Sequence, residues 1–266
     1  MKNKQRIIYY RDELNDDFAG TNIKRKPLKP NFRFFVTNPF YRFLTSVFYY
    51  LIAVPIFWII AKLIYNVKVK GKKKLKKAGF QKTGGFIYGN HTMIGDAFMA
   101  PIYVALPRRI RIICSQETVS IAFIRNIIMP LGAYPIPNEK NLAQTNHFLD
   151  GIDFFIKKKE KILIFPEGHI WPYYTKIRPF SEKSFSYPAK QGTPVVAICT
   201  TFKKRKFLKF RRPQPIVHIS NLFYPDMSLS LGERALKLRN DVYEFMVDCC
   251  SSLDNYEYIK YIKKED

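Results

Sequence analysis

The sequence predicts an α/β protein with a mixed, largely parallel sheet flanked by helices, preceded by an N-terminal apolar helical segment that associates with a membrane. Three observations support this fold class. Apolar runs bounded by turn residues alternate with stretches of helical periodicity along most of the chain. The 266 residues suffice for one substantial domain with a buried core. One uncharged apolar stretch precedes this alternation.

The apolar stretch divides the chain into three parts. Residues 1–42 form a basic extension, residues 43–65 form the membrane-associating segment, and residues 66–266 form the main domain. The uncharged core of the segment, 43–61, is at the lower length limit for a spanning helix, and Pro55 would kink it. An interfacial or re-entrant helix therefore fits at least as well as a span, and a helix buried against the domain is the alternative.

The main domain then alternates between strands and helices. Residues 66–71 alternate in polarity as a strand does, Gly79 closes a short basic helix, and Pro107 stops the next helix. Residues 141–160 carry apolar side chains at helical spacing. The expected strands are 66–71, 84–90 (ending in a turn), 109–114, 161–168 (running into a loop), 193–202 and 215–220. The expected helices are 72–79, 96–106, 117–129, 141–160, 181–192 and 229–253.

Charge and cysteine usage narrow the class of function. The net charge of +24 favours an anionic partner, namely a lipid surface, a nucleic acid or an acidic carrier protein. The sequence contains no zinc-finger, RNP or KH signature, so a nucleic-acid-binding protein is the more distant alternative. Four cysteines without CxxC spacing and four dispersed histidines predict reduced thiols and no metal cofactor.

A first polar cluster lies in the turn that ends the expected strand segment 84–90. It contains Asn90, His91 and Asp96 in the sequence GNHTMIGD. A histidine in this position can take a proton from a bound hydroxyl, and a carboxylate on its other ring nitrogen fixes the tautomer. The two residues are five positions apart, so they need a turn between them to meet, which Gly95 facilitates.

A second polar cluster, FPEG, follows the strand beginning at Lys161. Pro166 and Gly168 restrict this loop so that it presents Glu167, which can accept hydrogen bonds. Functional groups gather where strands end in α/β sheets, so we expect both clusters to lie together.

NHxxxxD, LGAYPIP, FPEG and TPVVAI, in this order within residues 84–202, resemble the blocks of the lysophosphatidic acid and glycerolipid acyltransferase family. The resemblance implies that 66–266 is a catalytic domain in which His91 is the general base and Asp96 orients it. Asn90, Glu167 and Gly168 would belong to the acceptor site. The implied reaction needs no metal or cofactor, and its acyl donor is acyl-CoA, an acylated carrier protein or acyl phosphate.

The chain departs from the family where the acceptor phosphate binds. The second block of the family usually ends in an arginine, whereas this chain reads LGAYPIPNEK, with Lys140 nearby. His169 and Ile170 follow FPEG in place of Thr–Arg, and Arg178 is a candidate for replacement charge. The acceptor is therefore either a lyso-glycerolipid such as 1-acylglycerol 3-phosphate or a lyso-glycolipid without phosphate.

These features predict an enzyme at the cytoplasmic face of the cell membrane, either peripheral or with one embedded segment. The expected partners are an anionic lipid surface, a lyso-lipid acceptor and an acidic acyl carrier protein, and no nucleic acid. A non-catalytic lipid-binding or scaffold protein on the same fold is the alternative.

Overall fold

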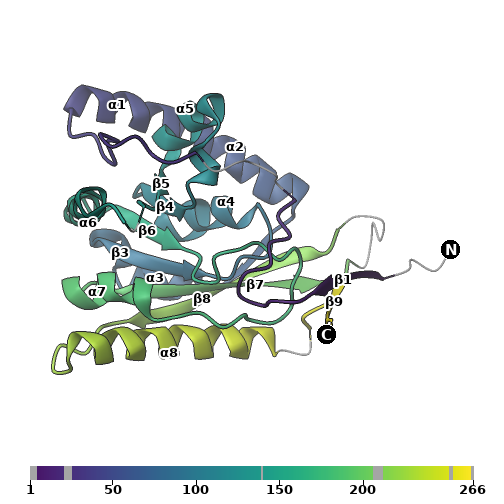
Figure 1. Ribbon diagram of the computed structural model, residues 1–266. Helices are drawn as coiled ribbons and strands as arrows, with labels where there is room; N and C mark the ends of the chain where they lie inside the picture. The colour runs from purple at the N-terminus through teal and green to yellow at the C-terminus, as the bar shows by residue number, and fades with distance from the viewer. Residues whose placement is uncertain (1–4, 21–25, 139, 206–211, 252–253, 265–266) are drawn as a thin grey trace.

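A mixed sheet forms the centre of the computed structural model, which describes residues 5–20, 26–138, 140–205, 212–251 and 254–264 (Figure 1). Its strands are β2 (Lys68–Lys70), β3 (Gly85–Gly89), β4 (Ile110–Cys114), β5 (Ala133–Pro135), β6 (Lys161–Ile164), β7 (Val195–Lys203) and β8 (Gln214–Phe223). Their order is β2-β8-β7-β3-β6-β4-β5. The strands from β7 to β5 are mutually parallel, whereas β8 runs antiparallel to β7 and β2 runs parallel to β8. The predicted fold class is confirmed.

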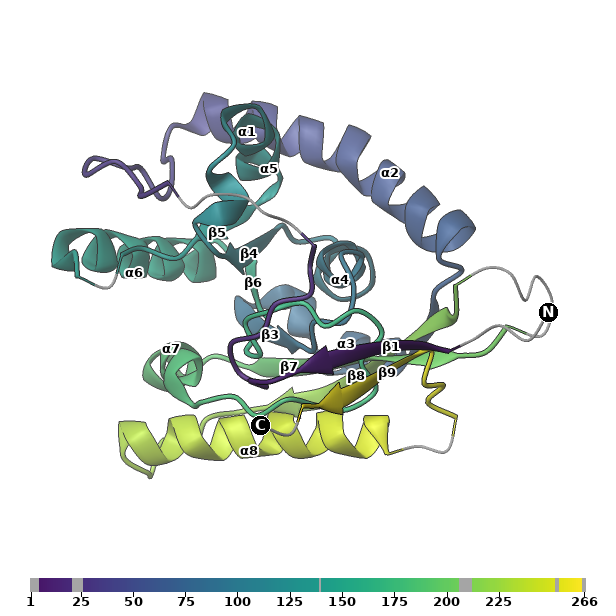
Figure 2. The ribbon, with the colours of Figure 1, turned by 45° about the vertical axis from the view of Figure 1, so that its right-hand side comes forward.

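Helices cover both faces of the sheet, as Figures 1 and 2 show. Side chains of α6 (Leu142–Lys157), α7 (Ser186–Gln191) and α8 (Leu231–Cys250) pack on one face, and those of α3 (Lys72–Lys77) and α4 (Asp96–Ala100) pack on the other. Successive side chains of a strand point to opposite faces, so Phe86 and Tyr88 of β3 enter one core and Ile87 enters the other. This two-sided burial explains why the strand GFIYG is apolar throughout.

One long helix, Pro39–Ile64, contains the predicted apolar segment. It consists of α1 (Pro39–Phe48), a π-helical turn, α2 (Val54–Ile59) and a second π-helical turn. Asn38 caps its start by accepting a hydrogen bond from the Tyr41 amide at 3.0 Å. Pro55 lacks the amide for a helical bond, and a π-helical turn immediately precedes its helical segment. The helix begins before residue 43, and the three-part domain division stays a prediction.

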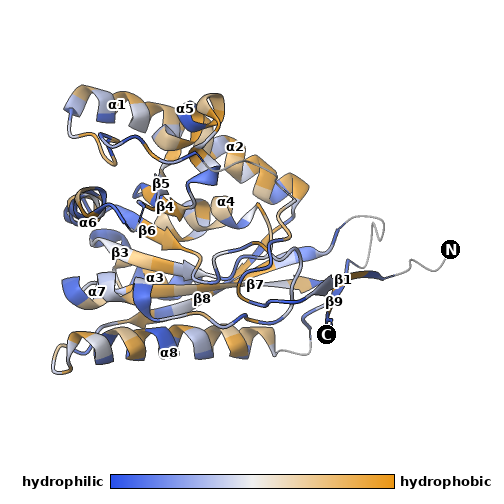
Figure 3. Cartoon of the chain, in the orientation of Figure 1, coloured by the Kyte–Doolittle hydropathy of each residue, from blue (hydrophilic) through white to orange (hydrophobic). Residues whose placement is uncertain are grey.

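Most of this long helix is exposed, and the apolar helix α5 (Ala122–Leu131), which has no buried residues, lies beside it (Figure 3). By length and composition it is able to cross a membrane, and only 17% of its most apolar window is buried. Phe57 anchors it to the domain by stacking on Phe98, with ring centroids 4.6 Å apart. Among the side chains of these two helices, the most exposed apolar ones are Phe40, Phe43, Leu51, Leu63 and Ile64 on the long helix and Phe123 on α5. The structure therefore does not bury this segment as a core helix.

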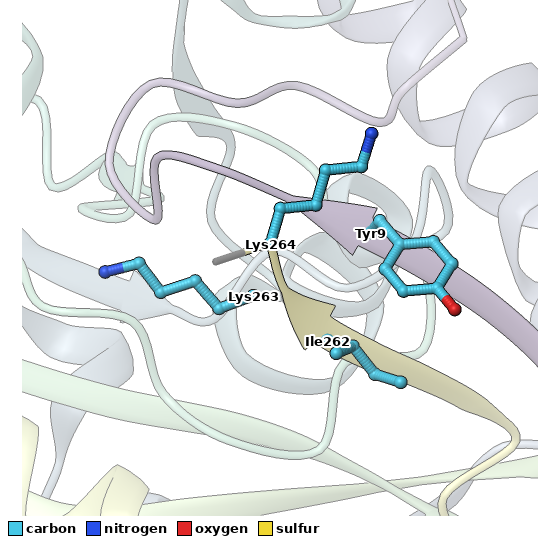
Figure 4. A pocket seen from close by; sticks show the side chains of 4 residues that line it. All are labelled: Tyr9, Ile262, Lys263 and Lys264. Atoms are coloured by element: carbon cyan, nitrogen blue, oxygen red, sulfur yellow. The ribbon is translucent and has the colours of Figure 1, made fainter. Parts of the chain in front are cut away.

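The two ends of the described chain meet in a small second sheet. Strand β1 (Arg6–Tyr10) pairs in parallel with β9 (Ile259–Lys263), and neither strand was expected from the sequence. A surface hollow of about 560 Å³ on this sheet is lined by Tyr9, Ile262, Lys263 and Lys264 (Figure 4). None of the predicted site residues lines this hollow.

Candidate active site

His91, Asp96 and Glu167, three of the predicted site residues, meet at the carboxyl ends of β3, β6 and β7. His91 follows β3, Glu167 follows β6, and Thr200 of β7 lies beyond the residues that pair with β3. These three strands are neighbours and run parallel, so their ends open at the same edge of the sheet. The expected convergence of the NHxxxxD and FPEG clusters is confirmed by the contacts between them.

His91 and Asp96 face each other across the turn predicted from the sequence. His91 Nδ1 lies 3.4 Å from Asp96 Oδ2. The same oxygen accepts hydrogen bonds from the backbone amides of Thr92 at 2.7 Å and Met93 at 2.8 Å, which hold the carboxylate in place. A proton on Nδ1 then faces the carboxylate and leaves the Nε2 lone pair available to a hydroxyl. The pair therefore has the geometry of an oriented general base.

Thr200 holds the other oxygen of Asp96 and was not identified from the sequence. Its hydroxyl donates to Asp96 Oδ1 at 3.3 Å. Its backbone exchanges two hydrogen bonds with the buried Asn90 amide, at 2.8 and 3.0 Å. Asn90 therefore ties the end of β3 to β7, and its predicted part in acceptor binding stays a prediction. The only signal for Thr200 was a polar Thr–Thr pair directly after an apolar strand.

The FPEG loop supports His91 from two directions. The Phe165 ring stacks on the imidazole with centroids 4.0 Å apart and an interplanar angle of 9°. Glu167 Oε2 accepts from the His91 amide at 3.1 Å, and Oε1 accepts from the Arg178 amide at 3.0 Å. Burial raises the pKa of Glu167, and the nearby Arg178 charge opposes this shift. Phe165 and Glu167 thus fix the plane of the His91 ring and the position of its backbone.

Arg178, the predicted replacement for the phosphate-binding arginine, is fully buried. Its Nη2 lies 3.5 Å from Glu167 Oε2, and its guanidinium donates to the carbonyl oxygens of His169 and Glu13. Burial lowers the pKa of Arg178, and the Glu167 carboxylate counteracts that effect. The guanidinium is therefore engaged with Glu167 and with two loops, one of them from the N-terminal segment.

The remaining predicted residues lie at the margin of this cluster. Gly168 has a φ of +79°, a left-handed conformation in which the FPEG loop turns away after Glu167. Lys140 is exposed on the loop before α6, and no contact of the described residues connects its side chain to His91. Within the described part of the chain, no three His, Cys, Asp or Glu side chains are placed to share a metal ion.

A histidine beside a buried carboxylate, where neighbouring parallel strands end, is an arrangement suited to taking a proton from a hydroxyl group. Residues 66–201, slightly more than half of the chain, match the family described as Acyltransferase, and the chain belongs to this family. The fold is similar to the crystal structure of the 1-acyl-sn-glycerophosphate (LPA) acyltransferase, PlsC, from Thermotoga maritima. That similarity has a TM-score of 0.54 and 16% sequence identity, and it covers 79% of this chain and 97% of the other. No curated protein matches the sequence.

Proposed function

We propose that this acyltransferase moves a fatty acyl group from an acyl thioester or acyl phosphate to a hydroxyl of a lyso-glycerolipid. The observation that carries the proposal is the His91–Asp96 pair at 3.4 Å, in a chain that belongs to the acyltransferase family. His91 Nε2 removes the proton of the acceptor hydroxyl, and Asp96 stabilises the imidazolium that forms. The hydroxyl oxygen attacks the acyl carbon, the bond to the carrier breaks, and the leaving group takes the proton from His91.

The long apolar helix supports a position at the membrane, which we place at the cytoplasmic face of the cell membrane. Its exposed apolar surface and the exposed Phe123 of α5 suit contact with acyl chains. The net charge of +24 suits an anionic lipid surface and an acidic acyl carrier protein as donor. The lyso-lipid acceptor would then enter from the bilayer. The donor is a substrate, and the proposed reaction uses no cofactor.

Two classes of acceptor lipid are candidates, one with a phosphate group and one without. 1-Acylglycerol 3-phosphate is the phosphate-bearing candidate, which the structure of PlsC, the LPA acyltransferase, supports through fold similarity. A lyso-glycolipid without phosphate is the second candidate, because the Arg178 guanidinium is buried against Glu167. Lys140 remains the exposed cation proposed for the phosphate.

The test is transfer of radiolabel by detergent-purified protein to a panel of lyso-lipids with and without phosphate. Acyl-CoA, acylated carrier protein and acyl phosphate serve in turn as donors. We expect one acceptor class to be labelled, and we expect His91→Ala to abolish transfer. His147→Ala is the matched control, because His147 lies on α6, outside the site, where its ring packs against that of Phe35. Transfer that persists in His91→Ala would refute the mechanism, and a protein that binds these lipids without turnover would support the scaffold alternative.

A further inference from the structure

Three of the four cysteines gather where β7 packs against the end of α8. Cys199 is buried on β7, and Cys249 and Cys250 are the last two residues of α8. The Cys199 and Cys250 sulfur atoms lie 3.6 Å apart, and all the cysteines are reduced. Cys114 lies on β4, separated from β7 by β3 and β6. The fold thus brings together thiols about fifty residues apart in sequence.

Cys199 and Cys249 differ in acidity because they share a hydrogen bond. The hydrogen bond from Cys199 lowers the pKa of Cys249, which is partly exposed. The hydrogen bonds with Cys249 and Cys250, together with burial, raise the pKa of Cys199 well above its ordinary value. Cys249 is therefore more acidic than Cys199, whose thiol lies beside it. A partly exposed thiolate next to a second thiol is the arrangement of an oxidation-sensitive cysteine.

Cys199 also lies next to the residue that supports Asp96. Thr200 follows it directly and holds Asp96 Oδ1 through its hydroxyl and Asn90 through its backbone. A disulfide requires sulfur atoms about 2.05 Å apart, so the two side chains must approach each other from 3.6 Å at the strand position next to Thr200. Such a shift would act on Thr200, and through it on the carboxylate that orients His91.

We propose that Cys199 and the Cys249–Cys250 pair form an oxidation site for peroxides, in which a disulfide joins Cys199 to the end of α8. The Cys249 thiolate attacks one peroxide oxygen, the O–O bond breaks, and a sulfenic acid and one hydroxide form. The hydroxide takes up a proton to become water. A second thiol of the cluster attacks the sulfenic sulfur and releases a second water, and the resulting disulfide includes Cys199. In the net reaction, two thiols are oxidised to one disulfide and one hydrogen peroxide is reduced to two waters.

The experiment treats full-length protein with hydrogen peroxide, followed by thiol counting and peptide mapping. We expect two of the four thiols to be lost and a trypsin-resistant link between peptides 191–203 and 240–260. Dithiothreitol should restore both thiols. Cys114→Ser should behave as wild type, whereas Cys199→Ser should not form the link. If Cys199→Ser does not fold, the Cys249→Ser/Cys250→Ser double variant at the helix end makes the same test.

Four retained thiols after peroxide treatment would overturn the proposal, as would a bond confined to peptide 240–260. A loss of acyl transfer that parallels the link, and recovers with dithiothreitol, would support its effect on Asp96. This second readout rests on the proposed function, whereas the thiol count and the peptide map do not. Failure of the oxidation site is therefore distinguishable from failure of the proposed activity.

Discussion

Asp96→Asn tests whether the carboxylate acts through its charge or only as a cap on the turn. Three donors point at Asp96 Oδ2: the amides of Thr92 and Met93 and the ring of His91. The amide oxygen of asparagine can occupy this position and keep those bonds. Its NH₂ group then faces Thr200, whose hydroxyl can rotate to accept. The substitution therefore preserves the local geometry and removes the negative charge.

The expected loss of catalytic rate in Asp96→Asn follows from the position of the negative charge beside His91. An imidazolium about 4 Å from a carboxylate gains about 4 kcal/mol at an effective dielectric constant near 20. The Asp96 side chain is 2% exposed and that of His91 is 15% exposed, so solvent screening is limited. The 3.4 Å separation is long for a hydrogen bond, which places the expected loss at about 2–4 kcal/mol, or roughly 30- to 1000-fold in kcat.

The assay is steady-state acyl transfer with the acceptor identified by the lipid panel. We expect kcat to fall and KM to change little, because Asp96 is buried behind His91 and acts through it. The temperature of unfolding should stay close to that of wild type, which shows that the turn is intact. A correctly folded Asp96→Asn protein with kcat within threefold of wild type would refute the role of the charge.

Three further predictions concern residues around the site and the core. Thr200→Val should lower kcat roughly 3- to 10-fold, because one hydrogen bond to the Asp96 carboxylate is lost. Thr201→Val is the control and should leave kcat unchanged, because the Thr201 hydroxyl instead contacts a histidine of β8. Equal kcat values in the two variants would contradict this prediction. Glu167→Gln should reduce the free energy of unfolding by about 3–5 kcal/mol, because a buried guanidinium loses its carboxylate; denaturant unfolding measures this, and a loss below about 1 kcal/mol would exclude it. Burial lowers the pKa of Lys161 to about 7, so the unfolded state binds more protons between pH 7 and about 10.5 and stability rises with pH in that window. From pH 7 to 9, the free energy of unfolding of wild type should rise by about 2 kcal/mol relative to that of Lys161→Met. Equal pH dependence of this free energy in the two proteins would contradict the lowered pKa of Lys161.

The fold class was predictable because its signals are local. The apolar run at 84–90, the amphipathic helix near 141–160 and the turn residues between such elements each reflect a preference of a short segment. The apolar helix was equally evident, since length and composition alone define it. The NHxxxxD and FPEG clusters each directly follow a strand, and their order and spacing resemble the blocks of a known acyltransferase family.

Contacts between distant residues were decided only by the tertiary structure. Thr200 meets Asp96 across 104 positions because β7 lies beside β3, an order that neither strand encodes by itself. Arginine is a residue type that binds phosphate, yet Arg178 is buried against Glu167 and is therefore a partner of the FPEG loop. The pairing of β1 with β9 joins residues more than 250 positions apart.

The sequence by itself therefore determined the α/β class and the apolar helix, because each depends on neighbouring residues, and its resemblance to a known family predicted the His91–Asp96 pair. The tertiary structure decided which side chains support that pair, which charges are buried and which cysteines meet. These properties depend on the order in which strands assemble into the sheet. That order is set by the burial of apolar surface over the whole chain, which no local pattern contains.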